Sequence, residues 1–257
     1  MTIRFGPAGL GAVETACRVL GEYVGLGIKA CEIAFTYSVY IKPDDAIIIG
    51  KKAKELGIEL SVHAPYFINL NSDEKEKREA SKKRILDCCK IGELLEAKLV
   101  VFHPGFYGKD KEKAYESIKQ EVSEIIEIIK RNEWKIKIAP ETMGKINVFG
   151  SIEEIARLVG EAGCSFCLDF AHILAREKKV DWEKIEKLFP QKKWHAHFSG
   201  VEYVEKGEKH HKTTSRKEWE ELLKNLPKDK EIVIINESPT MIDDCIEEIE
   251  VEKEINY

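Results

Sequence analysis

The sequence has no excess of basic residues and no long apolar run. Acidic side chains outnumber Lys and Arg, and the formal net charge of the 257 residues is −5. A protein-wide basic surface for nucleic acid is therefore excluded, and any DNA-binding face must be local. Without an apolar run of about 20 residues there is no candidate membrane span. No signal peptide is recognised at the start, so we expect a cytoplasmic protein with no membrane partner.

A disulfide framework and a zinc ribbon are also missing. The seven cysteines are odd in number and are expected to be reduced thiols. Cys164 and Cys167 have the C-x-x-C spacing, but no second such pair accompanies them, which favours strand packing. Only two glutamines occur beside 46 acidic and 41 basic residues, a composition typical of the ion-paired surfaces of thermophile proteins.

Short apolar runs alternate with helical patterns along the whole chain. Apolar positions from Tyr115 to Ile129 keep the three-four helical spacing, and capping boxes begin at Ser151 and Ser215. The apolar runs are mostly continuous, as in strands covered on both faces. Eight of them can be marked, at residues 3–6, 30–35, 60–63, 99–103, 136–141, 166–169, 194–197 and 232–237.

Eight β/α units predict a single-domain (β/α)8 TIM barrel over residues 1–257. A doubly wound open sheet is the structural alternative. It is disfavoured because residues 6–11 contain Pro7 and lack the glycine spacing of a dinucleotide loop, so this segment fits a substrate loop better. Residues 247–254 are acidic and indicate a last helix with a solvated face.

Histidines and carboxylates gather at the ends of the predicted strands. His63, His103 and His197 each end or follow an apolar run, and the run at 166–169 ends in Asp169 with His172 three residues later. Glu141 and Glu237 end two more runs. In a β/α barrel the carboxyl ends of all strands meet at one mouth, so these residues are expected to surround a single pocket.

So many ionisable groups in one pocket require cations. Crowded carboxylates and imidazoles would repel or change protonation unless a cation neutralised them. Imidazole and carboxylate donors without a thiolate suit zinc or another transition metal at a catalytic site. The donors are too many for one tetrahedral ion and predict two or three ions.

Seven short motifs occur in the order found in one known family, and together they resemble the endonuclease IV family of apurinic/apyrimidinic endonucleases. The resemblance covers the chain from about Ser61 to Pro239. The motifs are His63-Ala-Pro-Tyr66-Phe67, Phe102-His103-Pro-Gly105, Pro140-Glu141-Thr-Met-Gly144, Cys167-Leu-Asp169-Phe-Ala-His172, His197-Phe-Ser-Gly200, Glu208-Lys-His210 and Asn236-Glu237-Ser-Pro239.

The resemblance implies a (β/α)8 barrel with three zinc ions, manganese or another divalent ion being the alternative. One ion would be held by His63 and His103 with Glu141. Glu141 would bridge to a second ion held also by Asp169, His197 and Glu237. A third ion would be held by His172, Glu208 and His210.

The implied reaction is hydrolysis of double-stranded DNA on the 5′ side of an abasic site, leaving a 3′-hydroxyl. Glu141 would act as the bridging ligand of metals that generate hydroxide, so no protein base is required. An abasic nucleotide is easily extruded because it lacks stacking and pairing.

The expected DNA-binding residues lie in the loops around the mouth. Tyr66 and Phe67 are expected to wedge into the duplex, their alternative being to pack under the next helix. The family's second loop tends to be basic, whereas residues 36–40 here are uncharged, and Tyr40 is expected to stack instead. Lys209, His211 and Lys212 are expected to bind phosphates of the DNA backbone.

Two other departures from the family pattern bear on the site. Glu208 stands where the family usually has Asp, so the third metal site is expected to be looser or differently spaced. Ser199-Gly200 replaces the usual Asn-Asp.

Two rival functions remain open from the sequence. The first is a sugar isomerase or epimerase of the xylose-isomerase-like superfamily, which needs only a set such as Glu141, Asp169, His197 and Glu237. The second is a non-catalytic metal-dependent DNA-binding barrel. We expect a monomer in each case.

Overall fold

The described part of the chain, residues 2–255 of a computed structural model, forms a parallel β/α barrel. Its parallel strands match the eight predicted runs and confirm the fold class. They are β1 (Thr2–Pro7), β2 (Ala30–Ala34), β3 (Glu59–His63), β4 (Leu99–Phe102), β5 (Lys137–Pro140), β6 (Leu168–Asp169), β7 (Lys193–Phe198) and β10 (Glu231–Asn236).

The strands form two four-stranded sheets, β1-β10-β7-β6 and β2-β3-β4-β5, which close on each other. On one side, Glu141 and Cys167 form a parallel bridge between the ends of β5 and β6. On the other side, the Lys29 amide donates to the Phe5 carbonyl at 3.0 Å. Closure here requires Gly6, because a Cβ atom at this position would lie 1.9 Å from the Ala30 carbonyl oxygen.

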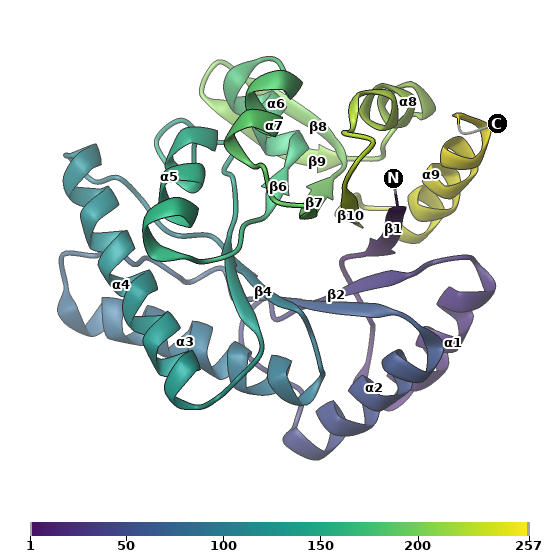
Figure 1. Cartoon of the computed structure of the whole chain (residues 1–257), viewed down its shortest axis with the longest axis horizontal. Helices are drawn as coiled ribbons and strands as arrows, with labels where there is room; N and C mark the ends of the chain where they lie inside the picture. The colour runs from purple at the N-terminus through teal and green to yellow at the C-terminus, as the bar shows by residue number, and fades with distance from the viewer. Residues whose placement is uncertain (1, 256–257) are drawn as a thin grey trace.

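Helices surround the strands on the outside (Figure 1). The apolar face predicted from Tyr115 to Ile129 lies on one long helix, and both predicted capping boxes are formed. The helices are α1 (Ala16–Gly25), α2 (Pro43–Leu56), α3 (Lys75–Leu94), α4 (Lys111–Arg131), α5 (Ile152–Ala162), α6 (Phe170–Glu177), α7 (Trp182–Leu188), α8 (Arg216–Asn225) and α9 (Met241–Ile255), with the short 3-10 turn η1 (Val13–Thr15).

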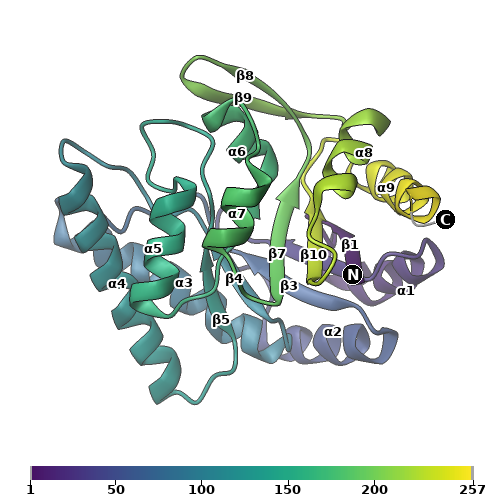
Figure 2. The same cartoon turned by 45° about the horizontal axis from the view of Figure 1, so that its top comes forward.

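One element interrupts the β/α alternation. An antiparallel hairpin, β8 (Gly200–Val204) and β9 (Gly207–Lys212), follows β7 and was not predicted. Figure 2 shows β7 running towards this hairpin, which projects beyond the strand ends. The hairpin contacts the loop after β5, where Lys145 and Gly207 form an antiparallel bridge. It therefore stands over the same end of the barrel as the predicted site.

The buried side chains match the sequence pattern. Trp194 and Trp219 are fully buried, and Phe102 and Phe149 lie in the same core. All seven cysteines are unpaired, and Cys164 and Cys167 are buried, as expected of strand packing. Among the helices of residues 2–255, none combines the length and apolar character that crossing a membrane requires.

Candidate metal centre

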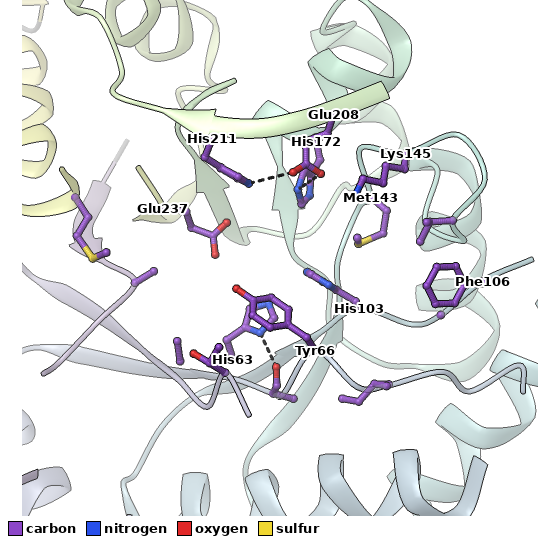
Figure 3. A pocket seen from close by; sticks show the side chains of 18 residues that line it. His63, Tyr66, His103, Phe106, Met143, Lys145, His172, Glu208, His211 and Glu237 are labelled. Carbon is purple, nitrogen blue, oxygen red and sulfur yellow. Dashed lines mark hydrogen bonds and ion pairs between the residues drawn. The ribbon is translucent and has the colours of Figure 1, made fainter. Parts of the chain in front are cut away.

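A pocket of about 530 Å³ opens at the carboxyl ends of the strands. Figure 3 shows His63, His103, His172, Glu208, His211 and Glu237 pointing into it. They come from β3, the loop after β4, α6, β9 and the loop after β10, so the barrel brings together residues far apart in sequence. This convergence is what the strand-end positions predicted.

Glu141 lies at the centre of this set and is buried. Its Oε2 atom is 3.1 Å from Nε2 of His63 and 3.1 Å from Nε2 of His103. Its Oε1 atom is 3.1 Å from Nδ1 of His172 and 3.6 Å from Nδ1 of His197. The two oxygens of one carboxylate thus face different donors, His63 and His103 at Oε2 and His197 at Oε1, which suits a carboxylate that bridges two ions.

A third group of donors lies towards the hairpin. His172 Nε2 is 3.2 Å from Glu208 Oε2, and His172 Nδ1 is 3.4 Å from Asp169 Oδ2. His211 Nε2 is 3.8 Å from Glu208 Oε1. The donor atoms of Asp169, His172 and His211 lie within 4.8 Å of one another.

His210 does not join this group, contrary to the prediction. Its side chain is 52% exposed and faces Glu202, 3.5 Å away, whereas His211 is 23% exposed and lines the pocket. The cause is a register shift in the hairpin. Tyr203 pairs with Glu208 but Glu202 pairs with His210, so Lys209 is an extra residue that reverses the alternation of faces.

Several of the pocket imidazoles are oriented by a neutral partner on Nδ1. His63 Nδ1 lies 2.8 Å from the Ala64 carbonyl, and His172 Nδ1 lies 2.9 Å from the Thr142 carbonyl. A carbonyl can only accept, so these nitrogens donate, and in the neutral imidazole each Nε2 atom has a lone pair available for a metal. His211 Nδ1 contacts the Ser199 hydroxyl, which leaves its Nε2 towards Glu208.

The carboxylates are crowded enough to disturb one another. Burial alone would raise the pKa of Glu141, but the imidazoles of His103 and His197 outweigh it and hold that pKa well below its usual range. Burial raises the pKa of Asp169, with Glu141 and Glu237 adding to the effect. Two neighbouring acids are thus driven in opposite directions, as expected where charge is concentrated.

The residues present fit a metal centre. Glu141 Oε1, Asp169 Oδ2 and His197 Nδ1 are buried and accept or donate no hydrogen bond within residues 2–255. Unpaired buried acceptors are costly, and cation binding would satisfy them. Glu141, Asp169, His197 and Glu237 form one set of donors, and His63, His103 and Glu141 form another. Carboxylate and imidazole donors of this kind suit zinc.

Two residues of the site were missed in the sequence. Glu32 is fully buried on β2 and contacts His197, and a charged residue inside the continuous apolar run 30–35 was the available signal. Lys145 lines the pocket beside Glu208 (Figure 3), and it is the one Lys or Arg among the described lining residues. No pattern marked it out in a sequence so rich in lysine.

The aromatic residues at the pocket entrance, Tyr66 and Phe67, are exposed to solvent. Tyr66 and Phe67 are 60% and 61% exposed, which removes the alternative that they pack under the next helix. Tyr66 lines the pocket, and Phe67 lies beside Tyr37, with ring centroids 6.3 Å apart. Tyr40 is 46% exposed and its ring packs edge-on against Phe35, so stacking of Tyr40 on DNA stays a prediction.

The two lysines predicted to bind phosphate lie on the hairpin, outside the pocket lining. Lys209 is 3.6 Å from Glu202, and Lys212 is 3.4 Å from Glu218. These ion pairs are exposed and therefore weak. His211, the third predicted phosphate contact, lies among the metal donors instead.

The chain was compared with known proteins. A family model described as "Xylose isomerase-like TIM barrel" matches residues 22–254. An uncharacterised protein of Methanocaldococcus jannaschii is 35% identical, with 94% of each chain covered. A "Probable endonuclease 4" of Exiguobacterium sibiricum is 37% identical over 47% of this chain and 42% of its own length.

Solved structures with the same fold include members of both functional classes. Endonuclease IV from Thermus thermophilus superposes with a TM-score of 0.70 at 19% identity, covering 98% of each chain. A D-tagatose 3-epimerase-like protein gives a TM-score of 0.70 at 23% identity, covering 98% of this chain and 96% of its own. Because these identities are low, the superpositions establish the fold alone. With the family model matching nearly the whole barrel, the chain belongs to the xylose isomerase-like TIM barrel family.

Proposed function

We propose that this protein is a zinc-dependent endonuclease that hydrolyses the phosphodiester bond on the 5′ side of abasic sites in double-stranded DNA. The observation that carries the proposal is the position of Glu141. One of its oxygens faces His63 and His103, and the other faces His197 in the set that includes Asp169 and Glu237. The endonuclease 4 relatives match only about half of this chain, so they support the proposal only in part.

The number of donors favours a centre of several ions. Four donors, from Glu141, Asp169, His197 and Glu237, already suffice for one ion. The further donors of His63, His103, His172, Glu208 and His211 have no role in a one-ion site. Bound divalent ions would supply the Lewis-acid chemistry, lowering the pKa of water and stabilising charge on phosphate oxygens.

The protein's own residues would position the substrate. Lys145 places a permanent positive charge at the pocket wall, suited to an anionic phosphate. The exposed rings of Tyr66 and Phe67 beside the pocket could occupy the gap left by a missing base. Glu141 would hold its two groups of donors at a fixed separation. In this account the lesion enters the pocket while the flanking duplex stays at the rim.

The alternative is a sugar epimerase, and a specific observation supports it. The four-donor set around Glu141 can hold a single ion, and a pocket of about 530 Å³ could enclose a sugar. This alternative gives no role to Lys145 or to the donors outside the four-donor set, which are His63, His103, His172, Glu208 and His211.

One experiment tests the two functions together. Protein stripped by a chelator and reloaded with zinc is incubated with a duplex carrying one abasic analogue, with an undamaged duplex, and with a ketose such as tagatose. We expect nicking on the 5′ side of the lesion that depends on zinc and leaves a 3′-hydroxyl. Epimerisation without nicking would replace the proposal by the alternative.

A further inference from the structure

A buried carboxylate lies beneath the predicted metal centre, inside the barrel. Glu32 is 0% exposed and sits in the middle of β2. Its Oε2 atom accepts from the Ser61 hydroxyl at 2.7 Å and lies 3.0 Å from His195 Nε2. Its Oε1 atom lies 2.9 Å from His197 Nε2. An ionised group this deep requires such partners, and here they come from β3 and β7, not from β2 itself.

His197 differs from the other oriented imidazoles of the pocket. His63 and His172 are held by backbone carbonyls, and His211 by a serine hydroxyl, all of them neutral groups. Behind His197 stands the carboxylate of Glu32. A carboxylate on the far nitrogen of a ligating imidazole fixes its tautomer and raises its basicity, which tightens metal binding.

The two nitrogens of His197 have different surroundings. Nε2 is in close contact with Glu32, although no hydrogen bond is aligned between them. Nδ1 is 3.4 Å from Glu237 Oε1 and 3.6 Å from Glu141 Oε1. Two ligands of one tetrahedral zinc, each about 2.0–2.2 Å from it, lie about 3.3–3.5 Å apart. The Nδ1 side therefore has the spacing of a coordination site, and the Nε2 side has that of a hydrogen-bond partner.

We infer that Glu32 is a positioning residue that keeps the proton of His197 on Nε2 and so directs Nδ1 to the ion held with Glu141, Asp169 and Glu237. The inference rests on the metal centre of the proposed function. Ser61 and His195 hold the carboxylate in place on its other oxygen. The effect is largest at that ion, because the carboxylate lies 2.9 Å from His197 Nε2, while His63 and Glu237 each have a ligand atom within 4.8 Å of it.

The test measures metal affinity and uses no DNA. Zinc-loaded Glu32→Gln protein is titrated with a chromogenic chelator beside the wild type. Loss of the charge is expected to weaken one class of zinc by roughly 10- to 100-fold and to leave the zinc held near His172 and His211 unchanged. Glu121→Gln is the matched control, because Glu121 is also buried but pairs with Lys82 on α3, away from the pocket.

A second measurement needs no variant, so it remains decisive if Glu32→Gln does not fold. The side-chain ¹⁵N shifts of His197 in the zinc-loaded wild type are expected to show a proton on Nε2 and none on Nδ1. Unchanged zinc affinity in Glu32→Gln, or the opposite tautomer in the wild type, would overturn the inference. If both results are as expected but abasic DNA is not cut, the positioning role stands and the proposed nuclease activity fails.

Discussion

The strand-end donors and the hairpin donors of the pocket are held in different ways. Glu141, Asp169 and His197 are buried and extend from parallel strands whose neighbours fix them on both sides. Glu208 and His211 stand on β9, whose ladder is formed with β8 and which meets the loop after β5 through a single bridge at its first residue. Two strands alone are marginal in water. The strand-end donors should therefore form a rigid site, and the hairpin donors a more adjustable one.

The hairpin is held over the pocket by packing on α6 and by contacts with the loop after β5. The Glu208 amide donates to the Gly144 carbonyl at 3.3 Å, and a Cβ atom on Gly207 would lie 2.1 Å from that same carbonyl oxygen. Gly207 also has φ = +107°, a conformation that favours glycine. An ion near Glu208 thus depends on this junction, whereas the ions near Glu141 depend on the barrel itself.

The largest effect is expected at the centre of the strand-end donors. Glu141→Gln removes the charge that faces four histidines and should lower incision of an abasic duplex by at least about 100-fold, together with loss of bound zinc. Nicking rate and zinc content are measured on the same preparation. Glu121→Gln serves as the control, and a fully active Glu141→Gln protein would remove the bridging role.

Two neighbouring histidines on β9 allow a matched comparison, because His211 faces the pocket and His210 faces solvent. His211→Ala should release one zinc and slow incision by roughly 10-fold, whereas His210→Ala should change neither. Zinc content by mass spectrometry and the nicking rate of both variants check this. If His210→Ala lost the ion instead, the register of the hairpin in solution would differ from the one described.

Lys145 lies where the loop after β5 meets the hairpin, and its charge allows a test of whether the substrate is a phosphodiester. Lys145→Ala should raise the KM for abasic DNA by roughly 10- to 100-fold, because a charged contact to phosphate is worth about 1.5–3 kcal/mol. Zinc content should stay the same. Lys51→Ala, on the exposed surface of α2, is the matched control. An unchanged KM would show that the phosphate does not reach this part of the wall.

The smallest effect on activity is expected at a buried acid outside the pocket lining, whose protonation affects stability instead. Burial raises the pKa of Glu248 on α9 well above its usual value, so the folded state holds a proton that the unfolded state releases. Stability should therefore fall as the pH rises above the unfolded pKa, by at most about 1.4 kcal/mol per pH unit. Chemical denaturation between pH 5 and 8 should show a shallower slope for Glu248→Gln than for the wild type.

The sequence predicted the strand-end donors better than the hairpin donors, for a physical reason. Buried parallel strands appear as continuous apolar runs, and the residue ending each run must face the mouth, so His63, Glu141 and Asp169 could be located from position alone. The face of a hairpin residue depends on strand register, and one extra residue exchanged His210 for His211. The charge of Glu32 inside an apolar run was visible in the sequence, but its contact with His197 leaves no local pattern.

The central claim is that donors from separate strands meet to hold several cations, and metal content tests it most directly. Protein stripped with a chelator, reloaded with zinc and desalted is analysed by mass spectrometry alongside Glu141→Gln. We expect about three zinc ions per wild-type chain and a clear loss in the variant. A wild-type chain that retains one ion or none after reloading would contradict it.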